Sequence, residues 1–299
     1  MKGFQVDKRR LKQDLIAYSF ILPNFIGFAV FTLFPMLFSM ILTFLNWDGA
    51  NPITFAGLNN FKRLFTDETF RIALFNTFYY TLTTVPVTVV CSLGLAVLLN
   101  KPIAGRNIFR GIFFFPHVAS LVAIAAVWNA IFHPTMGPVN QLLQSWGIAN
   151  PPKWSASTTW ALPTVIMASI WKSIGYYMII YLAGLQGIPR DLYEVAKIDG
   201  ANAWTVFTKI TLPMLRPTTF FILVILTINC FKVFDLIYVM TGGGPGRAST
   251  VLVLHIYNVA FKEYRFGYSS TIALVLFVIV LIITVFQFKL EKKWVTYMQ

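Results

Sequence analysis

Residues 188–217 read Ile-Pro-Arg-Asp-Leu-Tyr-Glu-Val-Ala-Lys-Ile-Asp-Gly-Ala-Asn-Ala-Trp-Thr-Val-Phe-Thr-Lys-Ile-Thr-Leu-Pro-Met-Leu-Arg-Pro. This polar-rich stretch lies between two long apolar runs and carries helix stop signals at both ends. Asp191 is predicted to cap a short helix, with Glu194 returning a hydrogen bond to the Asp191 amide, and Gly200 is predicted to end that helix. The apolar face of this helix consists of Leu192, Val195 and Ala196. The small Ala196 would let another protein approach the backbone closely.

A second short helix is predicted to follow. Asn202 is its expected N-cap, and Leu212-Pro213 is expected to break it before the next apolar run, because proline lacks an amide hydrogen and clashes with the preceding turn. The stretch therefore predicts two short helices, each with its own ends, beside a membrane.

The composition indicates a membrane protein. Of the 299 residues, 57% are hydrophobic, only 12% are charged and 29 are Phe, which is too apolar for a soluble globular chain of this length. A helix needs about 20 mainly apolar residues to cross a bilayer. The stretches that meet this requirement are 15–45, 76–99, 108–132, 160–185, 217–240 and 270–288. The basic N-terminus with its long apolar run is interpreted as an uncleaved first span rather than a signal peptide.

Basic residues orient these six spans. With an even number of spans both termini share a side, and the segments on that side carry Lys2, Lys8, Arg9, Arg10, Lys12, Lys101, Arg106, Arg110, Arg190, Lys197, Lys209, Arg216, Lys289, Lys292 and Lys293. The other side carries only Lys62, Arg63, Arg71, Lys153, Arg247, Lys262 and Arg265. Since Lys and Arg concentrate in cytoplasmic loops, both termini and 188–217 are predicted to be cytoplasmic. The net charge of +13 then reflects topology and contact with anionic membrane lipid, and it does not require nucleic acid.

Polar side chains inside spans are costly and therefore informative. They are Asn129, Lys172, Tyr176, Tyr177, Asn229, Lys232 and Asp235. Lys232 and Asp235 stand three apart, so they either neutralise each other on one helix face or take part in binding. Asn229 and the two tyrosines can bind and stack on a sugar, or can bond and pack against neighbouring helices. Lys172 has no evident partner in its own helix, and together with Lys232 it would suit a phosphate. The candidate substrate-binding residues are Tyr176, Tyr177, Asn229, Lys232 and Asp235.

The sequence contains no pattern typical of catalysis or metal binding. The histidines share no ligand spacing and no carboxylate companion, which argues against zinc and against a catalytic triad; they are His117, His133 and His255. Cys91 and Cys230 lie inside spans, where they are interpreted as small apolar residues. The glycine-rich stretch 242–247 lacks the Gly-Lys-Ser/Thr ending of a P-loop, so it is predicted to form a tight turn that can touch a binding protein. The chain therefore needs ATP and Mg²⁺ to be bound elsewhere if it uses them.

Two connections are longer than a turn. Residues 47–69 are predicted to form a folded loop with an amphipathic piece at 61–65, and 134–159 either faces a soluble partner or merely connects two spans. The first span is interrupted by Pro23, Gly27 and Pro35. Pro116 is a predicted kink site in the third span.

A spaced pattern inside 188–217 links the chain to a known family. It consists of Glu194-Val195-Ala196, Gly200, Ile210 and Leu212-Pro213. This pattern resembles the EAA loop of permease subunits of ATP-binding-cassette (ABC) importers, with Val195 where the family usually has Ala. The resemblance is sharpest to carbohydrate permeases similar to the first maltose or sn-glycerol-3-phosphate permease subunit, and it draws also on 183–189, 198–201, 234–236 and 241–246. It covers roughly residue 76 to the C-terminus.

The resemblance implies an all-α integral membrane protein with six transmembrane helices, in which a type I ABC importer permease core, methionine-importer-like and maltose-permease-like, carries an extra N-terminal helix. It divides the chain into an N-terminal segment with the first helix and outer loop (1–75), a permease domain (76–290) and a cytoplasmic tail (291–299). It also implies a multi-pass protein of a prokaryotic plasma membrane, with no enzymatic activity and no cofactor of its own.

The resemblance further implies partners and a mechanism. The partners are a homologous second permease, two ATPase subunits that bind ATP and Mg²⁺, and an extracytoplasmic binding protein that delivers a carbohydrate. Coupling to the ATPases falls on Asp191, Leu192, Glu194, Val195, Ala196, Asp199, Gly200, Ile210, Leu212 and Pro213. By alternating access, ATPase closure would move the helix 191–199 as a lever while the later spans rock around a central cavity.

Other functions remain open at this point. A self-contained ion-coupled carrier would need inverted repeats and a buried carboxylate, and Asp235 is the only acidic residue in any predicted span. An ABC importer for glycerol 3-phosphate or another non-sugar solute would carry the same motif. A membrane enzyme lacks its catalytic cluster, and a scaffold protein leaves the EAA spacing unexplained.

Overall fold

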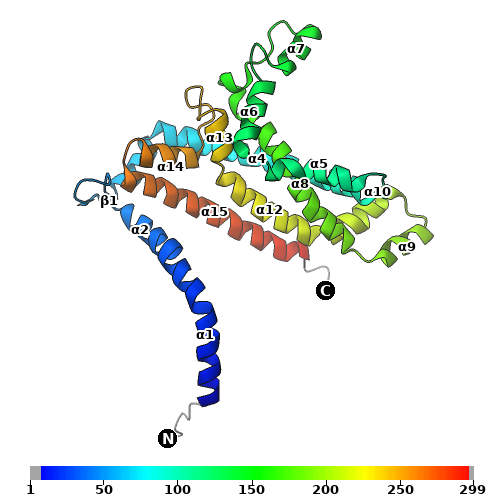
Figure 1. Ribbon diagram of the computed structural model, residues 1–299, viewed down its shortest axis with the longest axis horizontal. Coiled ribbons are helices and arrows are strands. Elements are labelled where there is room, and N and C mark those ends of the chain that lie inside the picture. Colours follow the sequence, from blue (N-terminus) through cyan, green and yellow to red (C-terminus); the bar gives the residue numbers. More distant parts are fainter. Residues whose placement is uncertain (1–7, 296–299) are drawn as a thin grey trace. The chain divides into compact units, whose positions relative to one another are not determined.

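The computed structural model describes residues 8–295 (Figure 1). These residues form two compact units. The smaller unit comprises 8–66 and 259–274, and the larger one comprises 67–258 and 275–295. Residues 1–7 of the predicted cytoplasmic segment and 296–299 of the predicted tail lie outside the described residues. The domain boundary at residue 75 stays a prediction.

The smaller unit begins with a long helix, and the apolar part of this helix, Ile16–Leu42, is almost unburied. Its segments are α1 (Lys8–Phe28), a π-helical turn (Ala29–Leu33) and α2 (Phe34–Leu42). In the π-helical turn the Phe34 amide donates to the Ala29 carbonyl, five residues back, and Pro35, which has no amide hydrogen, follows directly. The span therefore passes Pro23 and Pro35 without a break.

A small hairpin and a helix complete the first part of this unit. They are β1 (Leu45–Asn46), β2 (Thr54–Phe55), which pairs antiparallel with β1, and α3 (Asn59–Thr66). The side-chain amide of Asn60 donates to the carbonyl oxygens of Thr43 and Leu45, both at 3.0 Å, and so holds α3 against the hairpin. The amphipathic piece predicted at 61–65 is confirmed as part of α3. The hairpin is the one strand pairing among the described residues of an otherwise helical chain.

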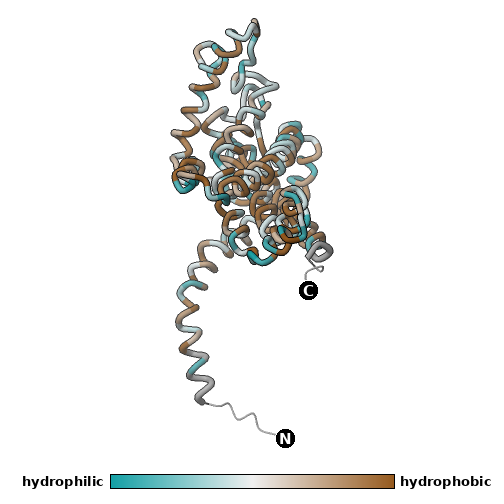
Figure 2. Tube along the Cα trace, turned by 90° about the vertical axis from the view of Figure 1, so that its right-hand side faces the viewer, coloured by the Kyte–Doolittle hydropathy of each residue, from teal (hydrophilic) through white to brown (hydrophobic). Residues whose placement is uncertain are grey.

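The larger unit holds most of the remaining helices of the described chain. They are α4 (Glu68–Asn100), α5 (Arg106–Val118), α6 (Leu121–Ile131), α7 (Pro138–Ser145), a 3₁₀ turn (Trp154–Ala156), α8 (Ala161–Gln186), α9 (Arg190–Ile198), α10 (Ala203–Val206), a π-helical turn (Phe207–Thr211), α11 (Leu212–Met214), α12 (Arg216–Phe231) and α13 (Asp235–Met240). Two further helices have residues in both units: α14 (Leu252–Phe261) and α15 (Phe266–Val295). Figure 2 shows that hydrophobic residues predominate along most of these helices.

Within residues 8–295, four helices are long and apolar enough to cross a membrane: Ile16–Leu42, Glu68–Asn100, Ala161–Gln186 and Phe266–Glu291. Two bent pairs add two more, namely Arg106–Val118 with Leu121–Ile131, at 100°, and Ala203–Met214 with Arg216–Phe231, at 63°. Counting each pair once gives six spans, which is the predicted number. The fifth differs from its predicted bounds 217–240, because the bent pair begins at Ala203, inside the stretch predicted to be cytoplasmic, and ends at Phe231, before α13. The third span is broken rather than kinked, and its break lies at Ala119 and Ser120, beyond the predicted site Pro116.

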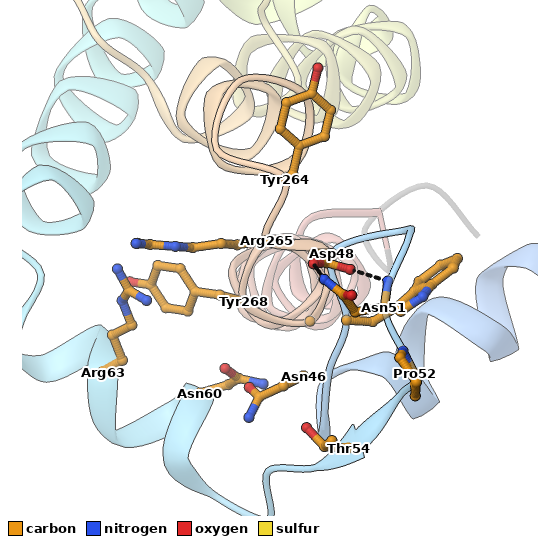
Figure 3. Close-up of a pocket in the computed structure, with 12 residues that line it drawn as sticks. Asn46, Asp48, Asn51, Pro52, Thr54, Asn60, Arg63, Tyr264, Arg265 and Tyr268 are labelled. Atoms are coloured by element: carbon orange, nitrogen blue, oxygen red, sulfur yellow. Dashed lines mark hydrogen bonds between the residues drawn. The ribbon is translucent and has the colours of Figure 1, made fainter.

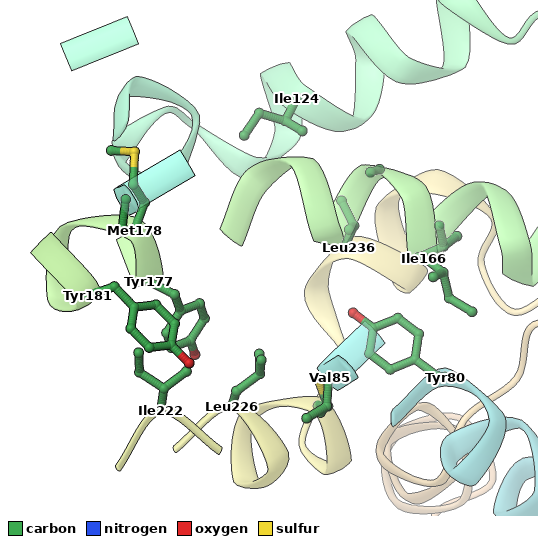
Figure 4. Close-up of a cluster of buried hydrophobic side chains, with 14 of the residues drawn as sticks. Tyr80, Val85, Ile124, Ile166, Tyr177, Met178, Tyr181, Ile222, Leu226 and Leu236 are labelled. Atoms are coloured by element: carbon green, nitrogen blue, oxygen red, sulfur yellow. The ribbon is translucent and has the colours of Figure 1, made fainter. Parts of the chain in front are cut away.

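The core of the larger unit forms where α8 packs against α4, α5 and α12 (Figure 4). Tyr80, Met178 and Tyr181 are among its largest fully buried side chains. The Tyr80 hydroxyl donates to Ser169 Oγ at 2.6 Å, and the Tyr181 hydroxyl donates to Thr219 Oγ1 at 3.2 Å. The polar ends of these buried rings are therefore satisfied inside the unit.

Helices α5 and α8 meet backbone to backbone at Gly175. A Cβ atom at Gly175 would lie 1.8 Å from the carbonyl oxygen of Phe113 and 2.8 Å from the amide nitrogen of Phe114. Real Cβ atoms do not approach backbone this closely, so only glycine fits here. By contrast, a Cβ at Gly94 in α4 would have no neighbour within 4 Å.

The glycine-rich stretch 242–247 forms the predicted tight turn. Three of its glycines have positive φ, at +60°, +90° and +62°, which glycine adopts without strain. The Thr250 hydroxyl donates to the Gly243 carbonyl oxygen at 3.0 Å. The side-chain amide of Asn76 donates to carbonyl oxygens within 247–250 at 2.9 to 3.3 Å, which ties the turn to α4.

One histidine has a carboxylate companion, so that expectation was wrong for His255. His255 Nε2 lies 3.1 Å from Asp67 Oδ2, and both side chains are largely buried. The other oxygen of Asp67 accepts a hydrogen bond from the Phe70 amide at 3.1 Å and caps α4. The two residues are 188 positions apart, which is why spacing could not reveal the pair.

The connection 134–159 is folded rather than an open loop. It contains α7 and the 3₁₀ turn, and its centre is the buried side chain of Asn140. Asn140 donates to the carbonyl oxygens of Pro134 and Pro152 at 2.7 and 3.0 Å, and it accepts from the Trp154 indole at 2.6 Å. The three hydrogen bonds of the Asn140 amide thus join the two ends of the connection.

Candidate functional site

Helix α9 is the first of the two helices predicted in 188–217, and it begins without a side-chain cap. Its N-cap residue is Pro189, with φ −56° and ψ 133°. The expectation that Asp191 caps this helix together with Glu194 was wrong, because α9 begins at Arg190 and places Asp191 inside its first turn. A carboxylate in that position favours the helix through the macrodipole instead.

The end of α9 at Gly200 is confirmed. Gly200 has φ +72°, its amide donates to the Lys197 carbonyl at 3.2 Å, and the Ala201 amide donates to the Ala196 carbonyl at 2.9 Å. These two bonds form a Schellman motif. An added Cβ at Gly200 would meet nothing within 4 Å, so the backbone angle alone requires glycine.

The two sides of α9 differ in burial. On one side Ala196 is only 7% exposed, and the half-buried Tyr193 has its hydroxyl 3.2 Å from the Thr211 hydroxyl. The other side, here called the exposed α9 face, carries Leu192, Val195 and Ile198, which are 40%, 56% and 85% exposed. The predicted face was therefore partly wrong, because Ala196 packs within the chain and Ile198 takes its place outside.

The second helix begins at Asn202 as predicted, with the Asn202 side chain accepting from the Thr205 amide at 2.8 Å. Pro213 does not break this helix. In the π-helical turn before it the Leu212 amide donates to the Phe207 carbonyl, five residues back, and this shift of register accommodates the missing amide of Pro213. The bend to α12 comes at Leu215 instead. Ile210 and Pro213 are half-buried, and Leu212 is 40% exposed.

A cavity of about 420 Å³ lies in the larger unit. Side chains from α4, α5, α6, α8, α12 and α13 line it. All the candidate substrate-binding residues lie in its wall: Tyr176, Tyr177, Asn229, Lys232 and Asp235. The structure thus brings together in one place side chains that the sequence singled out separately.

The fifth predicted span breaks at this cavity. Lys232 is the C-cap residue of α12, and Asp235 is the first residue of α13. The two therefore do not share one helix face, and in the part of the chain that the structure describes no ion pair joins them. The interpretation that they neutralise each other was wrong because it assumed an unbroken helix.

Aromatic rings form one side of the cavity. The ring of Tyr176 stacks on the ring of His117, with centroids 4.3 Å apart and 12° between the planes, and it meets Tyr177 edge-on at 5.1 Å. Tyr177 is 3% exposed and belongs mainly to the core, with its hydroxyl bonded to the Asn229 side chain. Tyr176 is half-buried, so it is the more accessible of the two rings.

Sequence reasoning missed some cavity residues. His117, Ser169 and Ser173 line it, although no motif marks them. They become visible only as neighbours of Lys172 and Tyr176 once α5 and α8 are packed. Asn129 was also singled out, but it lies outside the cavity lining and donates to the Met240 carbonyl at 3.2 Å.

The smaller unit has a separate pocket of about 390 Å³ beside the hairpin (Figure 3). In its wall the Arg63 guanidinium lies 4.6 Å from the centre of the Tyr268 ring. Asp48 accepts hydrogen bonds from the amides of Ala50 and Asn51 at 3.0 and 2.8 Å. These bonds, that of Asn51 first, lower the pKa of Asp48 to about 2. Asp48 is thus ionised at neutral pH and closes the turn between the strands.

Among residues 8–295, no three His, Cys, Asp or Glu side chains come together in a group that could hold a metal ion. Six apolar spans and a short exposed helix between two of them define a permease subunit of a type I ABC importer. The chain belongs to the family of binding-protein-dependent transport system inner membrane components, whose family model matches residues 13–296. It is accordingly a multi-pass membrane protein.

Known proteins agree with this assignment. The chain is 40% identical to the probable ABC transporter permease protein YesP of Bacillus subtilis, over 96% of this chain and 93% of that protein. It is 36% identical to the lactose transport system permease protein LacF of Rhizobium radiobacter, over 92% and 93% of the two chains. A chain in the crystal structure of a bacterial alginate ABC transporter, in complex with a periplasmic protein that holds an alginate pentasaccharide, superposes with a TM-score of 0.82. That chain is 28% identical, and the match covers 93% of this chain and 94% of that one.

Proposed function

We propose that this chain forms half of the translocation pathway of an ATP-driven importer for a sugar. The observation that carries the proposal is the exposed α9 face. Three exposed apolar side chains on one short helix with defined ends are expected to contact a protein partner rather than water. In a permease of this family the partner that fits is an ATPase subunit, which would bind ATP and Mg²⁺, so that this chain catalyses no reaction itself.

The cavity supports a sugar as the solute. The accessible ring of Tyr176 offers a face on which a sugar can stack, and Ser173 and Asn229 offer groups that can bond its hydroxyls. The names of the relatives point the same way, since one is a lactose permease and another comes from an alginate transporter. The solute is therefore proposed to be a mono- or oligosaccharide.

Two further partners are proposed, namely a second permease that covers the exposed residues of the cavity and a binding protein that delivers the sugar. Asn229, Lys232 and Asp235 line the cavity and yet are exposed, which is expected if a homologous second permease supplies the opposite wall. The first span is only 6% buried, so lipid or that second permease would cover it. An extracytoplasmic binding protein would deliver the sugar, as a periplasmic protein does in the alginate complex.

Alternating access then has a physical basis in α9. With both termini and α9 in the cytoplasm of a prokaryotic cell, as the distribution of Lys and Arg predicts, closure of the ATPases would push on the exposed α9 face. Tyr193 and Ala196 on the other side would pass this push to the π-helical turn before α12. The helix α12 ends at the cavity, so a movement of α9 would change the cavity wall.

The proposal is tested by purifying the tagged chain from its native membrane in mild detergent. We expect a second permease-like chain and an ATPase to co-purify, and we expect ATP hydrolysis to rise when sugar-loaded binding protein is added. Val195→Asp should remove the ATPase from the complex, because a charge on the exposed α9 face opposes an apolar contact. Phe65→Asp on α3, where the side chain is 84% exposed, is the matched control and should leave the ATPase bound.

A different result would assign another function. If the chain is recovered alone or as a homodimer without an ATPase, the importer proposal fails and an ion-coupled carrier takes its place. If the complete complex forms but responds only to a non-sugar solute such as glycerol 3-phosphate, the importer stands and the sugar does not.

A further inference from the structure

Resting on the proposed function, we infer that the solute is an acidic saccharide, one that carries a carboxylate or phosphate group, and that Lys172 and Lys232 bind this anionic group. Both lysines line the cavity of the larger unit. Lys172 comes from the middle of α8, and Lys232 comes from the end of α12.

The charges in the cavity wall do not cancel. Lys172 and Lys232 face a single acidic side chain there, that of Asp235. The ion pairs recorded among the described residues join Arg247 to Glu68, His255 to Asp67 and Arg265 to Glu263, and none of them includes a residue of the cavity. The cavity wall therefore carries an excess of positive charge and attracts an anion.

The position in its helix accounts for the presence of Lys232 but does not account for that of Lys172. Lys232 is the C-cap residue of α12, where a cation interacts favourably with the carbonyl end of the helix. Lys172 lies well inside α8 (Ala161–Gln186) and gains nothing of this kind. A lysine at membrane depth is costly unless it faces a water-filled cavity or a partner, and such lysines mark solute pathways. Lys172 is thus the residue whose presence a ligand best explains.

The neighbours of Lys172 make this a site for a saccharide rather than for a small ion. Ser169, Lys172, Ser173 and Tyr176 follow one another at helical spacing, so they lie on one face of α8, and all four line the cavity. That face combines an ammonium group, two hydroxyls and an aromatic ring. A lysine ammonium binds as a point charge and accepts either a carboxylate or a phosphate.

The experiment uses the complete complex with its second permease and ATPases, embedded in nanodiscs. Binding is measured by calorimetry for digalacturonate and dimannuronate, for the neutral methyl esters of both, for glucose 6-phosphate and for maltose. At least one acid should bind about tenfold or more tightly than its ester or than maltose, because a hydrogen bond to a charged group is worth more than a neutral one. The preference should weaken as salt is added. Uronates and glucose 6-phosphate distinguish a carboxylate from a phosphate ligand.

Variants connect the preference to the lysines. Lys172→Met and Lys232→Met should each lower the affinity for the acid and leave that for the ester unchanged, and Lys172→Arg should retain part of the preference. Lys62→Met is the matched control, since Lys62 is exposed on α3 and lines neither pocket, and it should change nothing.

Several outcomes would overturn the inference. Equal affinity for acids and esters, or binding of maltose alone, would leave a neutral-sugar importer and remove the anionic ligand. If Lys172→Met releases the second permease from the complex while the preference for acids stays, the lysine pairs with a carboxylate of that subunit. If no saccharide binds at all, the proposed sugar function fails together with the inference.

Discussion

Helix α9 and the cavity of the larger unit are the two regions on which the proposed function rests, and they are built in opposite ways. Everything that ends α9 lies within 189–201, and the bonds involved join residues only a few positions apart. The cavity instead gathers Tyr80, His117, Lys172 and Asp235 from four different helices. The helix proposed as a lever is therefore specified by its own residues, whereas the proposed solute pathway exists only after the spans have packed.

Gly200 in the first region and Gly175 beside the second show the same contrast between a local and a tertiary requirement. Gly200 has φ +72° and open space around it, so its requirement is conformational. Gly175 sits in an ordinary helix, but the backbone of α5 fills the place of its Cβ, so its requirement is steric. Substitutions at these two positions should therefore fail in different ways.

The largest effect is expected for Gly175→Ala. The added methyl would lie 1.8 Å from the Phe113 carbonyl oxygen, so α5 and α8 must separate, at a cost of about 3 kcal/mol or more. We expect a markedly lower thermal unfolding temperature for the detergent-purified complex, together with a loss of solute binding as the cavity opens. Gly94→Ala is the matched control and should be neutral or slightly stabilising, because it has open space in a helix. Equal stability of the two variants would contradict the close contact of α5 and α8.

A smaller effect on stability, but a specific one on coupling, is expected for Gly200→Val. A β-branched residue at positive φ costs about 1 to 3 kcal/mol of strain, which would displace the end of α9. The complex should insert and assemble, while ATP hydrolysis no longer drives uptake in proteoliposomes. Gly200→Asn should retain more coupling, since Asn tolerates this conformation. Normal transport by Gly200→Val, or failure of the variant to insert, would remove α9 from the role of lever.

The next largest effect concerns the two residues predicted to cap helices, Asn202 and Asp191, because only Asn202 makes a capping hydrogen bond. Asn202→Ala should destabilise the start of the second helix by about 1 kcal/mol, because the Thr205 amide loses its acceptor. Asp191→Asn should cost only a few tenths of a kcal/mol, since Asp191 makes no cap and loses merely its interaction with the helix dipole. Hydrogen exchange of the amides around 191–206 would measure both changes. A loss of about 1 kcal/mol for Asp191→Ala, which also removes the side-chain acceptor, would restore the cap that the sequence predicted.

The smallest effect concerns the turn at Asp48, in the smaller unit. The pKa of Asp48 is lowered to about 2 from a usual value near 4, so the ionised carboxylate favours the folded turn. This contribution is complete above the unfolded pKa, and it is lost as the pH falls from about 4 towards 2. Amide exchange at Ala50 and Asn51, corrected for its intrinsic pH dependence, should therefore accelerate over this range. Asp48→Asn should abolish the pH dependence, and a wild-type turn that stays protected at pH 2 would contradict the assignment.

Predictions from sequence succeeded where the physical cause is local. Asn202 caps its helix and Gly200 ends α9, because both depend on hydrogen bonds within one turn. Errors arose where a neighbour decides. Ala196 was expected on the docking face, but it is buried within the chain. It lies on the same side of α9 as Tyr193, whose hydroxyl contacts that of Thr211.

Breaks in the spans show most clearly what hydropathy alone does not predict. Hydropathy locates a run of apolar residues but does not reveal whether the helix through it is continuous. Lys232 and Asp235 were therefore placed on one helix face, although the chain breaks between them at the cavity. The wrong prediction of a helix break at Pro213 has the same origin. Proline usually ends a helix, but here the π-helical turn before Pro213 accommodates its missing amide hydrogen.

Composition and hydrogen bonds between near neighbours were sufficient to predict the membrane class, the six apolar stretches, the family motif and the C-terminal end of α9. Three features became apparent only in the folded chain: Lys172, Lys232 and Tyr176 share one cavity, Gly175 meets the backbone of α5, and His255 pairs with Asp67. These features join residues far apart in the chain. Their positions follow from the packing of whole helices, which no local pattern encodes.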